Sequence, residues 1–321
     1  MSGVMTSTVD HLIRSEIWST KLKEIFEADL FSMKYVDMLD DFPDGEIINI
    51  PSIGQVDTYD YEEGQAIRYT ALDTGNYQFR ITDYKASATY ITDKMKQDSY
   101  YTARLEAAFV PKQARAIAED MEEGVLSIGQ PGGLNGAQTA ADLNLINGHA
   151  HRFVGSGTGS TLAPQDFARA KLSLRKANVP MTNLIAIVDP SSEYVLSTLT
   201  NLVNVSFNPK WEGIVRDGIA TGMKFHMNIY GWDVYISDWL PKGLNETIDG
   251  DTTTSGVANL FFTTTGDANP FIGAMRQAPR VESERNKDYQ RDEYVTTARW
   301  GFGFYRPEAL VTVLTNETIT F

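Results

Sequence analysis

The sequence feature that most constrains this chain is residues 46–93, a segment typical of an extended β-hairpin with too little apolar surface to fold by itself. Residues 46–53 are rich in β-branched side chains, and Pro51 among them is best tolerated at a sheet edge. Residues 73–76 (DTGN) have the composition of a turn, and residues 77–82 alternate strictly between apolar and polar, as a strand does. A lone two-stranded ribbon is only marginally stable in water, so this one needs another surface to lie on.

The remaining sequence is long enough and apolar enough to supply a core. The chain has 321 residues, of which 42% are hydrophobic and 22% charged, which is typical of a soluble globular protein. No run approaches the ~18 apolar residues of a membrane span. The N-terminal residues lack the basic and apolar regions of a signal peptide. We therefore expect a protein made and folded in a cytoplasm, with no membrane partner.

Charge and cysteine content exclude several classes of function. The net charge is −14, from 42 acidic and 28 basic residues, whereas binding to nucleic acid by counterion release needs clustered Lys and Arg. If a chain of this kind acts near DNA, we expect it to enclose the DNA rather than bind to it. Cysteine is absent, which excludes disulfides, thiolate metal sites and cysteine nucleophiles.

Two helices are predicted on either side of the hairpin. Residues 9–30 have an amphipathic pattern, and this helix could pack on its own domain or act as an arm on a neighbouring subunit. Residues 98–126 form a longer pattern with one apolar stripe. Pro111 lies inside that stretch and predicts either a kink or a new helix with the proline in its first turn.

The second half of the chain alternates between helices and strands. Residues 129–160 are rich in glycine and are expected to be a mobile connection. A helix is predicted from Thr161, with Pro164 in its first turn and Pro180 after its end. Residues 184–188 predict a buried strand that leads into a helix capped by Asp189. Further strands are predicted over residues 225–241, meeting at Gly231, and throughout the last fifty residues, where the charged stretch 276–293 reads as a solvated hairpin.

The pair Gly301 and Gly303, in RWGFGFYRP, superficially resembles a phosphate-binding loop. Such a loop needs a third glycine and a following helix whose N-terminus meets the phosphate. Here aromatic residues alternate with the glycines, and Phe302 and Phe304 would share one face of a strand. We interpret this stretch as part of a sheet.

Other candidate chemical groups are equally weak. His149 and His151 could both bind a metal, but a catalytic zinc usually takes a third protein ligand. Ser191 and Ser192, which follow Asp189, lack the glycines of a nucleophile elbow and suit helix capping. The acidic stretches 40–46 and 249–251 do not match a calcium loop. We therefore predict no catalytic residues, no metal site, no cofactor and no enzymatic activity.

The order of the segments resembles the major capsid proteins of tailed bacteriophages, which have the HK97-like fold. The phrases that carry the resemblance are GEIINIPSIG, YEEGQAIRYTAL with YKASATYITD, NLIAIVDPSSEYVL, YGWDVYISDWLP and YVTTARWGFGFYRPEAL, and together they span most of the chain, about residues 9–314. Each phrase is moderately specific, and their shared order is more so. The resemblance implies an α+β fold with an N-terminal arm, an extended hairpin called the E-loop, a peripheral domain with a long spine helix, and an axial domain.

The resemblance also implies domain boundaries and contacts. The parts are residues 1–45 (N-terminal arm), 46–97 (E-loop hairpin), 98–180 (peripheral domain), 181–266 (axial domain) and 267–321 (return strands of the peripheral domain). The E-loop would reach over an adjacent subunit, and the charged hairpin would approach the three-fold contacts. The residues expected between subunits are Tyr59, Tyr61, Ile67, Tyr69, Tyr77, Phe79, Ile81, Arg276, Arg280 and Arg285.

The implied function is a shell subunit that forms the hexamers and pentamers of an icosahedral capsid around double-stranded DNA, without sequence-specific binding. The implied partners are further copies of the chain, a portal, a separate scaffolding protein and a decoration protein, with assembly in the bacterial host cytoplasm. No Lys–Asn cross-linking pair is evident, so shell strength should be non-covalent. One alternative is an encapsulin-like nanocompartment that encloses enzymes. A remote alternative is a metal-dependent hydrolase that uses His149 and His151.

Overall fold

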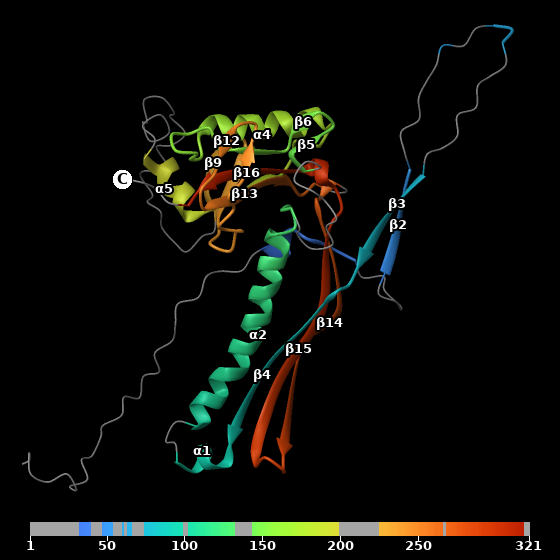
Figure 1. The fold of residues 1–321 in the computed structure, drawn as a ribbon. Coiled ribbons are helices and arrows are strands. Elements are labelled where there is room, and N and C mark those ends of the chain that lie inside the picture. Colours follow the sequence, from blue (N-terminus) through green and yellow to red (C-terminus); the bar gives the residue numbers. More distant parts are fainter. Residues whose placement is uncertain are drawn as a thin grey trace, which may run out of the picture.

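The computed structural model describes residues 32–39, 47–53, 60, 63–65, 74–98, 102–131, 143–198, 225–265 and 268–317. The predicted helix over residues 9–30 lies outside these ranges. The described residues form two units built on two separate sheets, with a two-stranded ribbon projecting from their junction (Figure 1).

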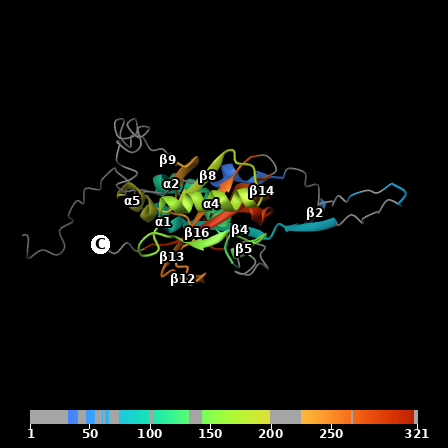
Figure 2. The same cartoon turned by 90° about the horizontal axis from the view of Figure 1, so that it is seen from above.

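The first unit is a six-stranded sheet with the strand order β7-β16-β13-β8-β10-β9. Its strands and helices are β7 (Arg152–Val154), α4 (Pro164–Lys176), β8 (Leu184–Val188), α5 (Pro190–Thr198), β9 (Phe225–Ile229), β10 (Trp232–Ile236), β13 (Gly256–Thr263) and β16 (Leu310–Asn316). The helix α4 lies along one face of the sheet, as the view from above also shows (Figure 2). Every residue of β8 and β13 is buried, because both faces of the sheet are covered.

Alternation along the central strands separates two cores. Leu184, Ala186 and Val188 face α4 and join Phe167 and Leu174 in one hydrophobic cluster. The intervening residues Ile185 and Ile187 face the opposite way. They join a second hydrophobic cluster, to which the second unit, described below, also contributes side chains. Because side chains of a strand point alternately to opposite faces, one five-residue strand links both cores.

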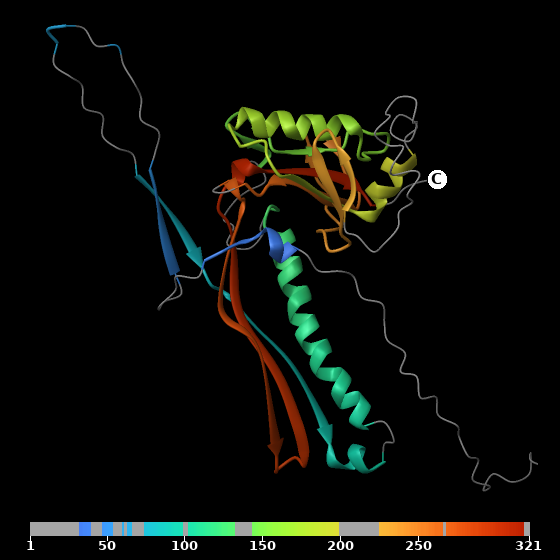
Figure 3. The ribbon, with the colours of Figure 1, turned by 180° about the vertical axis from the view of Figure 1, so that it is seen from behind.

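The second unit is a long four-stranded sheet, in the order β1-β14-β15-β4, with α2 packed beside it (Figure 3). Its elements are η1 (Ser32–Tyr35), β1 (Asp37–Met38), β4 (Asp83–Thr92), α1 (Asp93–Asp98), α2 (Thr102–Leu126), β14 (Phe271–Asn286) and β15 (Arg291–Phe304). Ile117, Met121 and Val125 lie buried on one stripe of α2, which confirms this part of the predicted pattern. The Gln113 side chain, in the same helix, accepts a hydrogen bond from the Thr296 hydroxyl at 3.1 Å.

The ribbon consists of β2 (Ile47–Ile53) and β3 (Thr74–Arg80), which pair antiparallel over their full lengths. It extends away from both units (Figures 1 and 2). The expected hairpin is therefore present, but its strands end at Arg80. Residues 83–92, which the sequence analysis placed in the same hairpin, pair instead with β15.

The small remaining elements are β5 (Leu145–Ile146), β6 (His149–Ala150), β11 (Thr247–Ile248), β12 (Asp251–Thr252) and η4 (Pro307–Ala309). Of these, β5 and β6 lie in the glycine-rich connection, part of which is therefore ordered. In particular, β7 pairs in parallel with β16 inside the six-stranded sheet, and its residues are buried. The expectation of a mobile connection is wrong for residues 143–160.

Two further expectations need correction. Residues 74–76 do not form a turn, because they lie within β3 and pair with residues 51–53. Pro111 does not start a new helix, since α2 runs through it as one element. Proline has no backbone N–H, so the carbonyl four residues earlier loses its helical hydrogen bond. This loss is tolerated in a helix that packs on the long sheet.

Several local predictions are confirmed. The strand over 184–188 and the following helix are present, and the Asp189 carboxylate accepts a hydrogen bond from the Ser191 amide at 2.8 Å. Gly231, with φ of +87°, lies in the turn between β9 and β10. The charged stretch forms the β14–β15 hairpin. The domain boundaries stay a prediction. The segments of β7, α4 and β16, which the resemblance assigns to the peripheral domain, pack in the six-stranded unit.

Candidate assembly surfaces

The root of the ribbon, where β3 meets β14, is packed against the rest of the same chain. Phe79 and Ile81 are 0% and 1% exposed and pack with Ile272 and Ala274 of β14 in a small hydrophobic cluster. Tyr77 joins the edge of this cluster, with its ring 5.5 Å from that of Tyr305 in an edge-on arrangement. Burial, with a smaller contribution from Tyr305, raises the pKa of Tyr77 to about 12, so its hydroxyl stays protonated at neutral pH.

The two glycines of the Gly-Phe-Gly stretch allow this close contact. A Cβ on Gly301 would lie 2.7 Å from the Arg80 carbonyl oxygen and 2.8 Å from the Ile81 Cα. A Cβ on Gly303 would lie 2.7 Å from the Phe79 ring. These distances are shorter than van der Waals contact, so the ribbon root can cross β15 only where β15 has no side chain. This confirms the interpretation of the stretch as part of a sheet.

The two faces of the ribbon differ. Ile48 pairs with Phe79 and Ile50 with Tyr77, and these side chains face the body of the same chain. On the other face Ile47, which is 45% exposed, pairs with Arg80. The following pairs on that face, Asn49 with Gln78 and Pro51 with Asn76, are exposed. The ribbon therefore has one exposed face that the described residues leave uncovered.

These facts place three of the residues that were predicted between subunits. The side chains of Phe79 and Ile81 are already enclosed within the chain, and Tyr77 is partly so. The alternation of residues 77–82 correctly indicated a strand. It carries no information on whether the same chain or another subunit covers the apolar face of that strand. Tyr59, Tyr61, Ile67 and Tyr69 lie outside the described residues.

The β14–β15 hairpin carries the other three predicted residues. Arg280 is 72% exposed at its side chain and lies 3.3 Å from Glu282 on the same strand. Arg285 instead binds Asp93 through two hydrogen bonds of 2.7 and 3.1 Å. Hydrogen bonding to Arg285 lowers the pKa of Asp93. Arg276 lies nearer the start of β14 than Arg280 and is half-buried. Their contacts with other subunits stay a prediction.

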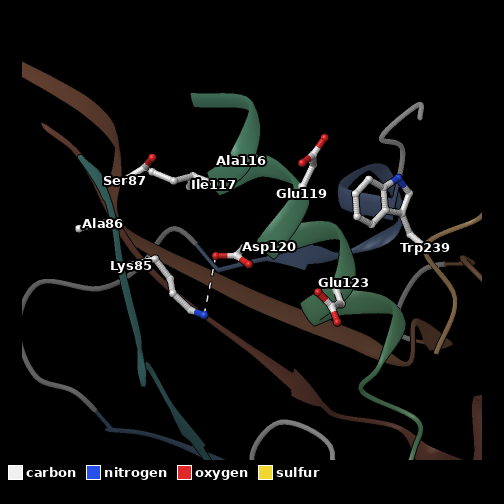
Figure 4. A pocket seen from close by; sticks show the side chains of 9 residues that line it. All are labelled: Lys85, Ala86, Ser87, Ala116, Ile117, Glu119, Asp120, Glu123 and Trp239. Atoms are coloured by element: carbon white, nitrogen blue, oxygen red, sulfur yellow. Dashed lines mark ion pairs between the residues drawn. The ribbon is translucent and has the colours of Figure 1, made fainter. Parts of the chain in front are cut away.

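Beside the long helix there is an acidic groove of about 370 Å³ (Figure 4). Its acidic side chains are Glu119, Asp120 and Glu123 of α2, and Lys85 of β4 faces Asp120 at 3.7 Å. Asp83 lies in a second hollow that shares Lys85, Asp120 and Glu123 with the first. Burial raises the pKa of Asp83, with a further contribution from Asp120 and opposition from Lys85. We call Asp83, Glu119, Asp120 and Glu123 the acidic groove.

His149 and His151 are not part of a cluster of metal-binding side chains among the described residues. His151 is 2% exposed, and its ring nitrogens lie 3.0 and 3.2 Å from the carbonyl oxygens of His149 and Glu308. Burial lowers the pKa of His151, and the two carbonyl oxygens oppose that shift. Across the described ranges, no group of three or more His, Asp or Glu side chains is arranged to hold a metal ion.

Two buried charged groups, which the sequence analysis did not single out, hold parts of the chain together. Arg152 is 1% exposed and binds the carboxylate of Glu246 as well as the Gln130 side chain, the latter at 2.8 Å. Glu122 on α2 accepts hydrogen bonds from the Ser32 amide and hydroxyl. No periodic pattern marks these residues, because their partners are distant in the chain. Ser32 lies 90 positions from Glu122, and Glu246 and Gln130 lie 94 and 22 positions from Arg152. Both groups have structural partners, which favours a structural role.

The helices that the structure describes include none long and apolar enough to span a membrane. This agrees with the absence of a long apolar run in the sequence.

The sequence matches the model of a protein family described as "Phage capsid protein" over residues 76–313. This range extends from β3 into β16 and so includes the long helix and all strands of the two large sheets except β1. No curated protein matches the sequence.

Solved structures share the fold over nearly the whole chain. A structure titled "Mycobacterium phage Che8" aligns with a TM-score of 0.67 at 17% identity, covering 95% of this chain and 98% of that one. The capsid structure of cyanophage P-SCSP1u aligns with a TM-score of 0.70 at 15% identity, covering 95% and 93%. The capsid asymmetric unit of cyanophage Pam1 aligns with a TM-score of 0.69 at 13% identity, covering 98% of both. The predicted α+β capsid fold is thus confirmed.

Proposed function

From the premise that this chain belongs to the phage capsid protein family, we propose that it is the subunit of an icosahedral shell that encloses the double-stranded DNA of a tailed phage. Capsid-titled structures of the same fold support this proposal. The chain's own contribution is self-assembly, and its location is the capsid of the virion.

The observation that carries the proposal is the ribbon. Only its root is packed on the chain, while the exposed face of β2 and β3 projects from the body (Figure 1). Two strands by themselves are marginal in water, and a neighbouring copy can supply the missing surface. Because the ribbon and the surface that receives it are different parts of one subunit, the contact is head-to-tail and repeats until a ring closes.

We assign the parts of the shell subunit as follows. The ribbon and the segment that links its two strands, together residues 47–80, are the E-loop that reaches an adjacent subunit. The long sheet with α2 is the peripheral domain, and the six-stranded sheet with α4 and α5 is the axial domain around five-fold and quasi-six-fold axes. Arg276 and Arg280 on the charged hairpin serve contacts near the three-fold axes.

The remaining partners follow from this role. The shell takes a portal and a separate scaffolding protein, with a decoration protein on the outer surface, and assembles in the bacterial host cytoplasm. A net charge of −14 suits a wall from which packed DNA must slide freely, since strong adhesion would hinder packing. The subunit has a structural role and no enzymatic one.

Electron microscopy of the protein, expressed alone and with its scaffold, tests the function. We expect closed icosahedral particles. A monomer or small dimer under every condition, with scaffold included, would overturn the proposal.

The contents of the particles separate a phage shell from a nanocompartment. Mass spectrometry of particles from infected cells should find portal or scaffold, and nuclease treatment should leave protected double-stranded DNA. Co-purification of one enzyme in place of portal and DNA would favour the encapsulin-like alternative, which neither the family match nor a described residue supports.

A further inference from the structure

The outer face of α4 is a basic surface on an otherwise acidic protein. The helix carries Arg169, Lys171, Arg175 and Lys176, and its sole acid, Asp166, is 1% exposed. The Asp166 carboxylate accepts hydrogen bonds from the backbone amides of Ser156 and Ala163 and is buried, so it is not part of the exposed face. The chain as a whole has a net charge of −14, and a helix face with this excess of cations stands out against it.

An apolar spot lies within this basic face. Leu172 is 56% exposed and Tyr230, in the turn between β9 and β10, is 59% exposed. Together with Ala168, Lys171 and Arg175 they line a shallow hollow of about 370 Å³. The Lys171 ammonium donates a hydrogen bond of 2.8 Å to the Tyr230 carbonyl oxygen, which holds the turn against the helix. Exposed apolar side chains rimmed by charges are typical of a surface that binds a protein.

The acidic groove on α2 has the complementary charge. Four carboxylates, Asp83, Glu119, Asp120 and Glu123, line its two hollows. Two cations oppose them, Lys85 beside Asp120 and Arg115, which lies 2.9 Å from Glu119. Two negative charges remain in excess. Burial is the main cause of the raised pKa of Asp83, Lys85 opposes it, and Asp120 adds to it.

The groove also offers an apolar contact. The Trp239 and Ile117 side chains contribute to its lining, as the close view of this groove shows (Figure 4). Each of the two surfaces thus combines charge with an apolar centre, and the charges are opposite in sign. Surfaces with complementary potentials attract each other and set the orientation of docking.

We propose that the basic face of α4 on one copy docks on the acidic groove of α2 on the next copy, and that this contact fixes the angle between adjacent subunits in a capsomer. The inference rests on the proposed shell function and adds a specific pair of surfaces to it. The two surfaces lie on different units of the chain, so each copy offers one of each kind. The contact is therefore head-to-tail, which is the type that closes into rings.

Reversal of charge on each surface, and then on both, tests the pairing. The variant Lys171→Glu with Arg175→Glu reverses the basic face, and Asp120→Lys with Glu123→Lys reverses the groove. We expect each double variant to raise the concentration needed for shell assembly by roughly tenfold or more, since several contacts are lost around each ring. The quadruple variant should recover most of the loss. Assembly is followed by sedimentation and electron microscopy.

A matched control separates pairing from net charge. It combines Lys171→Glu and Arg175→Glu with Asp249→Lys and Asp251→Lys, which reverse two exposed acids of the β11–β12 hairpin. This protein has the same net charge as the quadruple variant, with the new cations in the wrong place, and it should stay defective. Far-ultraviolet circular dichroism of the unassembled subunits should be unchanged in all variants.

The outcomes distinguish this inference from the function beneath it. Wild-type shells together with normal assembly of both double variants would overturn the docking proposal and leave the shell function standing. Normal shells from the Lys171 and Arg175 variant that lose co-purifying nucleic acid would also overturn it, because the basic face would then bind nucleic acid. Failure of the wild-type protein to assemble would overturn the shell function itself.

Discussion

Gly301 and Gly303 lie at the point where the ribbon root crosses β15. The clash at Gly301 would be with backbone atoms of residues 80 and 81, which cannot rotate away as the end of a flexible side chain can. At Gly303 the obstacle is the fully buried ring of Phe79 together with the Tyr77 hydroxyl. These two residues therefore position the ribbon, although they contact no ligand.

Replacement of Gly301 by alanine should destabilise the subunit. The added methyl group forces the two backbones apart, and overpacking of this kind costs about 1–3 kcal/mol. Urea unfolding of unassembled subunits measures the change. Ser283→Ala, at an exposed position of the neighbouring strand, is the control and should change the free energy of unfolding by less than about 0.5 kcal/mol. Equal unfolding midpoints for both variants would contradict the crossing described here.

His151 should make the stability of the subunit depend on pH below about 6.5, the usual pKa of histidine. Burial lowers the pKa of His151 in the folded state, so the unfolded chain takes up the proton first as pH falls. The free energy of unfolding therefore decreases as pH falls through this range and recovers above it. Urea unfolding at a series of pH values between about 7.5 and 5 measures the slope.

The variant His151→Gln checks whether His151 causes the pH dependence of the free energy of unfolding. Glutamine keeps a hydrogen-bond donor for one of the two carbonyl oxygens but does not titrate, so its pH dependence should be flatter. His149→Gln, which leaves the His151 ring in place, serves as the control and should keep most of the wild-type slope. A steeper slope for His151→Gln would refute the assignment.

At the scale of elements, the ribbon and the long sheet illustrate two ways to stabilise strands. β4 gains a partner in β15 along ten residue pairs and is covered by α2. β2 and β3 gain only each other and a small cluster at their root. The first arrangement is stable within one chain, whereas in the proposed shell the second is completed by another copy.

Removal of the segment that links β2 to β3 should separate folding from assembly. Replacement of residues 54–73 by Asn-Gly joins Ile53 to Thr74, which already pair at the end of the ribbon, through a favoured two-residue turn. The subunit should fold with an unchanged unfolding midpoint, because the described cores contain none of the removed residues. It should form no closed shells.

Electron microscopy and thermal unfolding of this shortened protein give the two measurements. The full-length chain under identical conditions is the control. Normal particles from the shortened chain would contradict the role of the ribbon in shell assembly, and an unfolded product would contradict the independence of the cores.

At the scale of the whole molecule, the two sheets and the ribbon place surfaces of different character on different sides. The charged end of the β14–β15 hairpin is far from the six-stranded sheet (Figures 1 and 3). Ion pairs within the chain occupy its tip, where Arg285 binds Asp93 and Lys96 binds Asp292. Arg280 lies nearer the middle of the hairpin and has a largely exposed side chain.

Replacement of Arg280 by alanine should impair assembly without loss of subunit stability. The side chain is exposed and its ion pair with Glu282 is on the surface, so its removal leaves no buried group unpaired. We expect an unchanged unfolding midpoint and a higher concentration for shell formation. Sedimentation of assembly reactions provides the measurement, and Glu282→Ala is a matched control for loss of the ion pair alone. Equal assembly by wild type and Arg280→Ala would remove this residue from the proposed three-fold contacts.

The sequence by itself determined the elements whose signals are local. The buried strand 184–188, the helix cap at Asp189, the turn at Gly231 and the charged hairpin all depend on residues close together in the chain, and the structure contains them. The absence of a nucleotide loop at Gly301 followed from the same kind of reasoning. The family resemblance added the architecture, which the fold comparison confirms.

Only the tertiary structure decided which segments pair and what covers them. β7 joins β16 across more than 150 positions, and β4 leaves the predicted hairpin to pair with β15, because sheet partners are chosen by packing among distant segments. It also showed that Phe79 and Ile81 are covered by their own chain, and it brought the cations of α4 and the carboxylates of α2 onto separate surfaces. Side-chain alternation indicates that a face is buried, but the identity of the burying surface is a property of the folded molecule.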